Sequence, residues 1–577
     1  MTSATLIARL RADLAAAHFS VPGLTGLWGI EADAALHRNQ RVPAQRALAA
    51  LAIKLGRNEP AATLARLFLL GDAVPRADLA AALPALGAAG AEQLGLVAAE
   101  GDTGVRPLVD LRPYSFIDAH GADSWWIVSD LGELVLGHPL GESHVLGIGG
   151  ASLTLSGLMM PRAVARALDI GTGCGIQAMH ASRHAEQVVA TDISVRALEL
   201  AALNATLNEI DNIEFRLGSL FEPVAGELFD HIISNPPFVI TPRAEGVPSY
   251  EYRDGGMVGD ALVEAVVRAA ADHLTPGGVA QLLGNWEYSG DTDAFERLEG
   301  WLTPGASAPT ARVAHSVAAP AASASISTEL PGDDTLAALS ASASPALDAW
   351  IIEREVQSPG EYAETWIRDG GTRPGPDFDR LYNAWLNDFE ARGVSRVGFG
   401  YLLLRRPAGD AVGVPAADEL SPSTTALTEG TSAGAAPTLR RLERMPDALG
   451  HNPAGLGAYL AECLAAHDWQ AQTNDSRLLR TNLTVASDVT EERHYWPGQQ
   501  DPTLMTLHQG SGFGRSVPLD TALAGLVGAC DGDLAVGAII GALAQLLDAD
   551  EESLTAELLP QVRALLVDGF LTIPEPV

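Results

Sequence analysis

The chain of 577 residues has little cysteine and no long apolar run. Its three cysteines, Cys174, Cys463 and Cys530, are odd in number and far apart, which argues against a disulfide framework and against a zinc site with paired thiolates. The longest apolar stretch, Leu534 to Leu547, is shorter than the roughly 20 residues that a membrane-crossing helix needs. We therefore expect a protein of the reducing cytoplasm, without membrane contact or a bound metal.

Positive charge is also scarce. The chain has 37 Lys and Arg against 72 Asp and Glu, a formal net charge of -35, and Lys54 is its single lysine. Such a charge repels phosphate over most of the surface and counts against broad electrostatic binding of nucleic acid, although a local basic groove remains possible. The first 20 residues interleave charged and apolar residues at helical spacing, so we expect an amphipathic helix there rather than a secretory signal.

The chain is too long for one hydrophobic core. We expect an N-terminal helical or winged-helix-like domain over residues 1–114 and a larger α/β domain over 115–406. A linker over 407–438 then leads to a C-terminal winged-helix-like domain over 439–577. The linker and a stretch inside the α/β domain, residues 303–347, are rich in Ala, Ser, Pro, Thr and Gly, a composition typical of flexible segments.

Apolar strands alternate with helices in the larger domain, which predicts a seven-stranded, doubly wound (Rossmann-like) sheet covered on both faces. The predicted strands are Ala167 to Ile170, Val188 to Thr191, Ile213 to Leu217, His231 to Ser234, Val279 to Leu283, Ala349 to Glu355 and Arg396 to Leu404. The predicted helices between them are at about 175–184, 194–208, 259–273 and 291–302. Mainly helical domains are expected to flank this sheet.

The first of these strands runs into a glycine-rich turn, Asp169-Ile170-Gly171-Thr172-Gly173-Cys174-Gly175, and then into a helix. Glycines let the backbone turn sharply and leave no side chain between the loop and a flat, polar ligand. The second strand ends at Asp192, about 20 residues later, where a carboxylate can accept the hydrogen bonds of a ribose diol. Loop and acid together predict a nucleoside-containing cofactor.

The fourth strand ends in Asn235-Pro236-Pro237-Phe238. Open α/β sheets bind ligands at this carboxyl edge. The Asn235 side-chain oxygen and the Pro236 carbonyl can each accept an N–H bond from a planar amide or amine nitrogen. The prolines fix the backbone that holds these acceptors, and Phe238 can stack on a flat group.

These motifs resemble those of class I S-adenosylmethionine-dependent methyltransferases with an NPPF motif. The sequence is similar to HemK-type enzymes, which methylate a glutamine side chain, and to ribosomal guanine-N2 methyltransferases of the methyltransferase small domain family. The resemblance covers about residues 115–300. It implies that Asn235, Pro236, Pro237 and Phe238 are catalytic. It also implies that S-adenosylmethionine is the cofactor. The residues that bind it would be Asp169, Gly171, Thr172, Gly173, Gly175, Asp192, Ile193, Ser219, Leu220 and Asn235. Ser219 departs from the family, which often has Asp there.

Several alternatives remain at this stage. The substrate is a protein glutamine, as in a release factor, or a base in RNA or DNA. A non-catalytic scaffold or nucleic-acid-binding protein with a methyltransferase-like domain is the main alternative function, and an NAD-dependent oxidoreductase a remote one. The segment from Tyr250 to Asp260 is either a substrate lid or a solvent loop in which Asp260 caps a helix. His180 and His184 are interpreted as helix-surface or packing residues and Trp286 as a packing residue, whereas Asn285 is expected to face the ligand edge.

Overall fold

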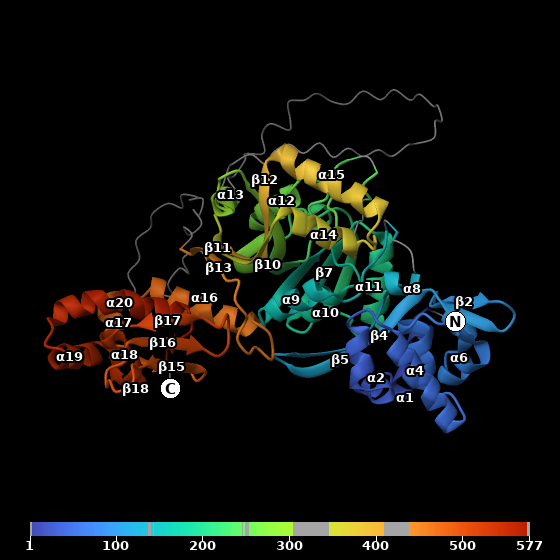
Figure 1. Cartoon of the computed structure of the whole chain (residues 1–577), viewed down its shortest axis with the longest axis horizontal. Coiled ribbons are helices and arrows are strands. Elements are labelled where there is room, and N and C mark those ends of the chain that lie inside the picture. The colour runs from blue at the N-terminus through green and yellow to red at the C-terminus, as the bar shows by residue number, and fades with distance from the viewer. Residues whose placement is uncertain are drawn as a thin grey trace, which may run out of the picture.

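A central α/β domain carries two smaller units, which both lie below its sheet in the view of Figure 1. The computed structural model describes residues 3–136, 140–141, 143–244, 246–248, 253–303, 346–408 and 438–573. The two stretches expected to be flexible, 303–347 and 407–438, fall almost entirely outside the described residues. Tyr250, Glu251 and Tyr252 also lie outside them.

Eight strands form the central sheet in the order β13-β11-β12-β10-β9-β6-β7-β8. β12 runs antiparallel to both of its neighbours, whereas the other pairings are parallel. The strands are β6 (Val164–Ile170), β7 (Ala185–Asp192), β8 (Ile213–Leu217), β9 (Phe229–Ser234), β10 (Leu274–Ser289), β11 (Asp348–Gln357), β12 (Val394–Arg405) and β13 (Arg440–Arg444). Each predicted strand lies within one of them. The seven-stranded prediction is one strand short, because β13 is too charged to be recognised as a buried strand.

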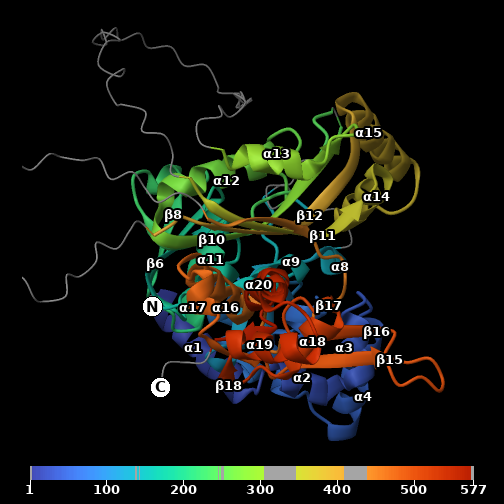
Figure 2. The ribbon, with the colours of Figure 1, turned by 90° about the vertical axis from the view of Figure 1, so that its left-hand side faces the viewer.

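Helices cover both faces of this sheet. Figures 1 and 2 show α12 (Ala261–His273) and α13 (Ala294–Trp301) on one side, and α9 (Gly150–Leu158) and α11 (Val195–Leu207) on the other. α10 (Ile176–Ala181) packs beside α9, and the single turn η2 (Glu222–Val224) precedes β9. The four predicted helices correspond to α10, α11, α12 and α13.

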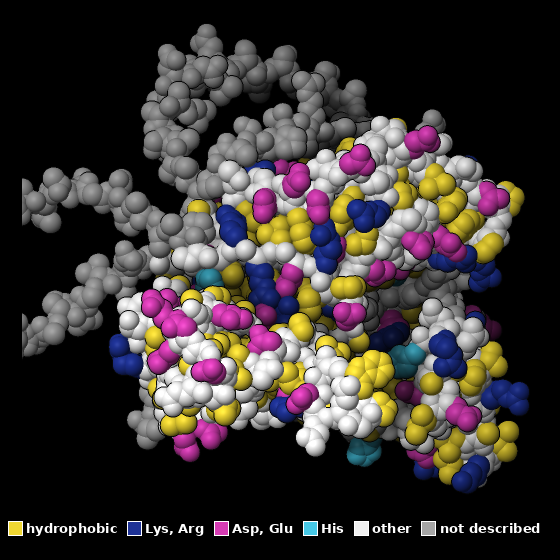
Figure 3. All heavy atoms as spheres, turned by 60° about the vertical axis from the view of Figure 1, so that its left-hand side comes forward, with side chains coloured by type: hydrophobic (Ala, Val, Ile, Leu, Met, Phe, Trp, Pro, Cys, Tyr) yellow, Lys and Arg dark blue, Asp and Glu magenta, His cyan; other side chains and the backbone are white. Residues whose placement is uncertain are grey.

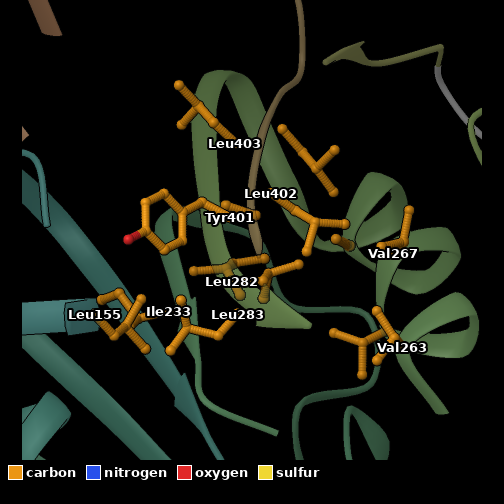
Figure 4. Packing of buried hydrophobic residues seen from close by; sticks show 14 of the residues in the cluster. Leu155, Ile233, Val263, Val267, Leu282, Leu283, Tyr401, Leu402 and Leu403 are labelled. Carbon is orange, nitrogen blue, oxygen red and sulfur yellow. The ribbon is translucent and has the colours of Figure 1, made fainter. Parts of the chain in front are cut away.

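The core of the domain lies between these layers. In Figure 4, Ile233, Leu282 and Leu283 project from the central strands, with Leu155 of α9 to one side and Val263 of α12 to the other. All five side chains are buried. Burial of an aliphatic side chain of this size contributes about 1.5–3 kcal/mol. This packing holds the strand ends that form the site in fixed positions.

Two helices inserted between β11 and β12 were not foreseen. α14 (Pro359–Asp369) and α15 (Pro376–Arg392) pack against β12. α14 begins with a capping box, in which the Glu361 amide donates to Ser358 Oγ over 3.3 Å and the Ser358 amide donates to Glu361 Oε2 over 2.9 Å. This Ser-Pro-Gly-Glu sequence is a helix-start signal that could have revealed the insertion.

The N-terminal unit combines helices with a three-stranded sheet of order β1-β3-β2. Its elements are α1 (Ser3–Ala16), α2 (Val21–Trp28), α3 (Ile30–Leu36), α4 (Val42–Leu55), α5 (Pro60–Leu64), η1 (Ala65–Leu69), β1 (Val74–Pro75), α6 (Arg76–Ala82), α7 (Gly87–Gln93), β2 (Val97–Glu100) and β3 (Gly104–Pro107). The hairpin of β4 (Val109–Asp118) and β5 (Gly121–Asp130) follows, and then the turn α8 (Glu133–Leu136). The expected domain boundary at residue 114 falls inside this hairpin.

Asparagines of α11 join this hairpin to the central domain. The Asn204 side chain accepts from the Val128 amide over 2.7 Å and donates to its carbonyl over 2.9 Å. Asn208 forms the same pair of bonds with Trp126 at 2.9 and 2.8 Å. The N-terminal unit is therefore fixed to the helix that follows β7.

The C-terminal unit contains helices and two small antiparallel sheets, so it is less purely helical than expected. Its elements are α16 (Gly457–Ala471), α17 (Asp475–Leu478), β14 (Asn482–Val485), β15 (Val489–His494), β16 (Leu504–Gln509), β17 (Ser516–Leu519), α18 (Thr521–Gly528), β18 (Asp531–Ala535), α19 (Val536–Leu546), α20 (Glu551–Val567) and β19 (Leu571–Thr572). None of the helices in the described ranges has the length and apolar character required to span a membrane.

A buried carboxylate ties β13, which leads into this unit, to the sheet. Glu353 of β11 is 2% exposed and accepts hydrogen bonds from Trp286 Nε1 at 2.8 Å, from the Tyr288 hydroxyl at 2.6 Å and from Arg444 Nε at 3.0 Å. A buried charge of this kind requires its partners, because removing one leaves the others uncompensated.

Candidate active site

The glycine-rich turn between β6 and α10 has an open side and a packed side. Gly171, Gly173 and Gly175 have φ values of 71°, 54° and 89°, in the left-handed region that L side chains avoid. A Cβ atom at Gly171 or Gly173 would meet nothing within 4 Å, whereas one at Gly175 would lie 2.9 Å from the Cβ of Ala201. The first two glycines therefore border open space, and the third lets α10 approach α11.

Asp169 lies under this turn, at the end of β6. Its side chain is 1% exposed, and Oδ2 accepts hydrogen bonds from the Thr172 hydroxyl at 2.6 Å and from the Ala178 amide at 3.0 Å. Oδ1 is buried and accepts no hydrogen bond from the residues that the structure describes. Burial raises the pKa of Asp169 to about 7. A nearby cation would stabilise the ionised form and supply the missing partner.

Asp192 ends the neighbouring strand β7. Its Oδ1 accepts from the Ser194 amide at 2.8 Å and its Oδ2 from the Gly173 amide at 2.9 Å, so it holds the glycine turn against the strand. Burial raises the pKa of this carboxyl group. The next residue, Ile193, is 59% exposed. It offers an apolar surface next to the acid.

The turn after β8 contains Ser219 and Leu220. Leu220 has a φ of 46°, and the Thr191 hydroxyl donates to its carbonyl oxygen over 3.5 Å. This bond ties the turn to the end of β7. The Ser219 side chain is exposed. The structure therefore brings the predicted cofactor residues to one edge of the sheet, in three consecutive turns.

The Asn-Pro-Pro-Phe segment begins at the same edge, directly after β9. The buried Oδ1 of Asn235 accepts no hydrogen bond within the described parts of the chain. The Phe238 amide donates to the Pro236 carbonyl over 2.7 Å, so this carbonyl, predicted as a substrate acceptor, already has one partner. Phe238 itself is 8% exposed and packs on Phe399, with 5.7 Å between ring centroids. Little of its ring surface is left to stack on a substrate.

The chain after this segment folds back on itself. The Val239 amide donates to the Arg253 carbonyl over 2.9 Å, and the Gly255 amide to the Pro237 carbonyl over 3.1 Å. Asp260 does not cap α12. It accepts from the Glu287 amide at 2.8 Å and pairs with Arg297 at 2.7 Å, so the interpretation as a helix cap is wrong. The lid interpretation depends on residues outside the described ranges.

Three histidines lie near the end of α10, directly before β7 and within β9. His180 packs among the rings of Tyr114, Phe116 and Trp125. His184 Nε2 lies 3.0 Å from His231 Nδ1. Burial lowers the pKa of His180 and His184 to about 4 and that of His231 to about 3. These side chains are neutral packing groups, as expected for His180 and His184, and the fully buried Trp286 is also one.

One residue at this edge was missed. The hydroxyl of Tyr362, on α14, accepts hydrogen bonds from the Ile240 amide at 3.0 Å and from Asn285 Nδ2 at 2.5 Å. Asn285 is 1% exposed, so its amide is committed to this contact and does not face open solvent. Only the capping box before α14 could have drawn attention to Tyr362 from the sequence.

The sheet order and the glycine turn define a class I methyltransferase domain. The chain belongs to the methyltransferase small domain family, whose model matches residues 149–292. Residues 16–108 and 461–573 match two further families, each described as a domain of unknown function. The family match thus covers the part of the chain that contains the glycine turn, Asp192 and Asn235.

Curated relatives resemble the same region. The chain is 36% identical over 160 residues to a ribosomal protein uL3 glutamine methyltransferase of Bradyrhizobium diazoefficiens. This match covers 26% of this chain and 47% of that protein. It is 35% identical over 135 residues to a candidate protein N5-glutamine methyltransferase of Methanocaldococcus jannaschii, 23% of this chain and 67% of that protein. It is 37% identical over 131 residues to a release factor glutamine methyltransferase of Xylella fastidiosa, 21% of this chain and 47% of that protein.

The chain spans about half the length of most of these relatives. Among solved structures, a 16S rRNA guanine-N2 methyltransferase of T. thermophilus, in complex with S-adenosylmethionine and guanosine, is 22% identical. The match covers 39% of this chain and 57% of that one, with a TM-score of 0.23.

Proposed function

We propose that this protein is an S-adenosylmethionine-dependent methyltransferase that acts on a planar amide or exocyclic amine nitrogen. The observation that carries the proposal is the pair of buried, unpartnered oxygens, Asp169 Oδ1 and Asn235 Oδ1, at adjacent strand ends beside an open glycine turn. Buried acceptors without partners are rare in folded proteins and indicate a ligand that supplies the missing donors.

The site residues fit S-adenosylmethionine. Asp169 offers an acceptor to the cationic amino group of its methionine part, and the open side of Gly171 and Gly173 leaves room for the main body of the cofactor. Asp192 faces the ribose in this arrangement, and Ile193, Ser219 and Leu220 border the adenine. Thr172 orients Asp169, and Gly175 sets the helix position. Bound S-adenosylmethionine supplies an electrophilic methyl group.

Asn235 then orients the accepting nitrogen. The lone pair of an amide nitrogen is delocalised, so the nitrogen must be held in line with the methyl group before it can attack. The Asn235 oxygen accepts one N–H, and the second lone pair of the Pro236 carbonyl can accept another. Pro237 and the buried Phe238 keep these acceptors in place. No strong general base is required, because the proton leaves a nitrogen that carries positive charge after the transfer.

We favour a protein glutamine as the substrate. The curated relatives named above act, by their names, on glutamine in ribosomal protein uL3 or in release factors. The net charge of -35 opposes an extended contact with RNA or DNA, and acidic and basic side chains are interspersed on the face shown in Figure 3. A nucleobase substrate remains the second candidate, favoured by the winged-helix-like arrangement that we propose for the two flanking units. A cytoplasmic location is part of the same proposal.

Methyl-labelled S-adenosylmethionine tests this function. Wild-type protein and the Asn235→Ala variant are incubated with the label and with extract from cells that lack the gene, and the protein and RNA fractions are counted separately. We expect label in the protein fraction with wild type and none with Asn235→Ala. Label in the RNA fraction would show that the substrate is a nucleobase and not a protein glutamine. Label in neither fraction, despite cofactor binding, would favour the non-catalytic scaffold.

A further inference from the structure

The inserted helices α14 and α15 contact the segment that follows Asn-Pro-Pro-Phe at three places. Tyr362 of α14 accepts from the Ile240 amide over 3.0 Å. Arg253 Nη1 donates to the Trp366 carbonyl of α14 over 2.7 Å and lies 3.0 Å from Asp369. Arg380 of α15 donates to the Gly246 carbonyl over 2.8 Å. The two helices thus contact the folded-back segment near its start at Ile240, near its end at Arg253 and between the two at Gly246.

Of the three contacts, the one made by Tyr362 is nearest to Asn235 along the chain, because Ile240 follows Asn235 by only five residues. Its side chain is 3% exposed, and its ring packs near Trp366, Trp385 and Phe389, with centroids 5.9–6.0 Å away. Burial raises the pKa of its hydroxyl, so the group is neutral at physiological pH. The rigid ring places one oxygen between Ile240, in the segment after β9, and Asn285 of β10.

A hydrogen bond at Ile240 bears directly on the acceptor at Asn235. Residues 237–239, directly before Ile240, pair with residues 253–255 through the bonds of Val239 and Gly255. The backbone from the prolines to Ile240 has little freedom, because Pro236 and Pro237 fix their own φ angles. A shift at Ile240 is therefore transmitted to Asn235. Methyl transfer is sensitive to such shifts, because a displacement of about 1 Å can cost about a hundredfold in rate.

We infer that Tyr362 is a positioning residue for methyl transfer, and that α14 and α15 form the wall that sets the geometry of the Asn235 acceptor. This inference rests on the proposed function. Tyr362 does not touch the reacting atoms. It acts through Ile240, and its effect is on the maximal rate rather than on the binding of cofactor or substrate.

The test compares wild type, Tyr362→Phe and Tyr382→Phe in the full chain. Tyr382 lies on α15, where its ring stacks on Phe378. Tyr382→Phe is the matched control, because it also removes one tyrosine hydroxyl but leaves the hydrogen bond between Tyr362 and Ile240 intact. Label transfer is measured over a dilution series of extract from cells that lack the gene. Calorimetry measures the affinity for S-adenosylhomocysteine, and mass spectrometry measures amide hydrogen exchange.

For Tyr362→Phe we expect a maximal rate at least about tenfold lower, because two buried N–H groups, the Ile240 amide and Asn285 Nδ2, lose this partner. The half-saturating amount of extract and the affinity for S-adenosylhomocysteine should stay within twofold, and exchange should accelerate in residues 236–244. Tyr382→Phe should match wild type throughout. A wild-type rate in Tyr362→Phe would overturn the inference. A loss of rate with an equal loss of S-adenosylhomocysteine affinity would also overturn it, since that marks a general structural role.

If wild type transfers no label, the proposed function fails separately. Hydrogen exchange then tests on its own whether Tyr362 fixes the segment after Asn-Pro-Pro-Phe. Unchanged exchange in residues 236–244 of Tyr362→Phe would overturn it, and local acceleration would support it.

Discussion

The Ser234 hydroxyl donates a hydrogen bond of 2.9 Å to the carbonyl oxygen of Ile170. The two residues are the last of β9 and β6, and they are directly paired in the sheet. Each precedes a segment of the site, because Asn235 follows Ser234 and the glycine turn follows Ile170. The side-chain bond adds to the sheet pairing and fixes the glycine turn and Asn235 relative to each other.

Asp169→Asn should weaken cofactor binding and stabilise the ligand-free protein. The pKa of Asp169 in the folded chain, about 7, exceeds the ordinary value of 3.8. The folded state therefore retains a proton that the unfolded chain releases, and this carboxyl's contribution to stability falls as the pH rises from about 4 to 7. A neutral amide removes that loss. Denaturation at pH 8 should show equal or higher stability for the variant.

The same variant should bind S-adenosylhomocysteine at least about tenfold more weakly, because a charge-assisted hydrogen bond is lost. In wild type the affinity should rise as the pH increases through about 7, since the ionised carboxylate is the form that attracts a cationic amino group. Calorimetry between pH 5.5 and 8.5 measures both. Equal pH dependence in wild type and Asp169→Asn would contradict the role given to Asp169.

Gly171→Ala and Gly175→Ala separate cofactor binding from packing. Both positions have positive φ, so both variants incur a backbone strain of about 1 kcal/mol. Only Gly175→Ala also crowds Ala201, and it should lose about 2–3 kcal/mol in total. Gly171→Ala should lose at least about tenfold in S-adenosylhomocysteine affinity, because its methyl group occupies the open side. Urea denaturation and calorimetry check the pair, and a reversed order of stabilities would contradict the assignment.

Glu353→Ala should destabilise the protein by about 2–4 kcal/mol, because two buried aromatic donors, Trp286 Nε1 and the Tyr288 hydroxyl, lose their acceptor, whereas Arg444 keeps Asp293 as a partner. Glu355, on the same strand but exposed, is the matched control, and Glu355→Ala should change stability by less than about 0.5 kcal/mol. Urea denaturation gives both values. Similar values for the two variants would show that Glu353 is not the main link between β13 and the sheet.

Stability should fall as the pH is lowered below 6.5. The folded-state pKa values of His180, His184 and His231 lie at about 4, 4 and 3, below the ordinary 6.5. The unfolded chain therefore binds protons that the folded chain does not, at about 1.4 kcal/mol per pH unit for each histidine. The raised pKa values of Asp169, Asp192 and Glu287 act in the opposite direction, so the contribution of a histidine is read from the difference between wild type and a histidine variant. Denaturation at pH 7, 6 and 5 measures the slope, which should be smaller in His231→Gln.

Much of the central domain follows from the sequence. Val188 to Thr191 and His231 to Ser234 are buried on both faces, and such strands are nearly continuous apolar runs that are easy to recognise. Asp169, Asp192 and Asn235 were placed correctly at one edge, because the carboxyl ends of parallel strands meet there. The unpartnered oxygens of Asp169 and Asn235 do not follow from the sequence, because they depend on which neighbours approach each atom.

Other features depend on tertiary contacts that a sequence pattern does not contain. β13, Arg-Arg-Leu-Glu-Arg, is a strand because it pairs with β11 and because Arg444 reaches Glu353. Tyr362 is far from Ile240 in sequence, and only the fold brings them together. Asp260 has the position of a helix cap, but its carboxylate accepts from the amide of Glu287 and the guanidinium of Arg297 instead of from the first amides of α12.

Acid hydrolysis of the labelled protein shows whether the methyl group is on an amide nitrogen. Hydrolysis of a methylated glutamine side chain breaks the amide bond and releases the label as methylammonium, which becomes volatile methylamine when the hydrolysate is made alkaline. We expect the label from wild-type reactions to be recovered as methylamine, and Asn235→Ala reactions to give none. Label that remains on a non-volatile amino acid after hydrolysis would contradict this expectation.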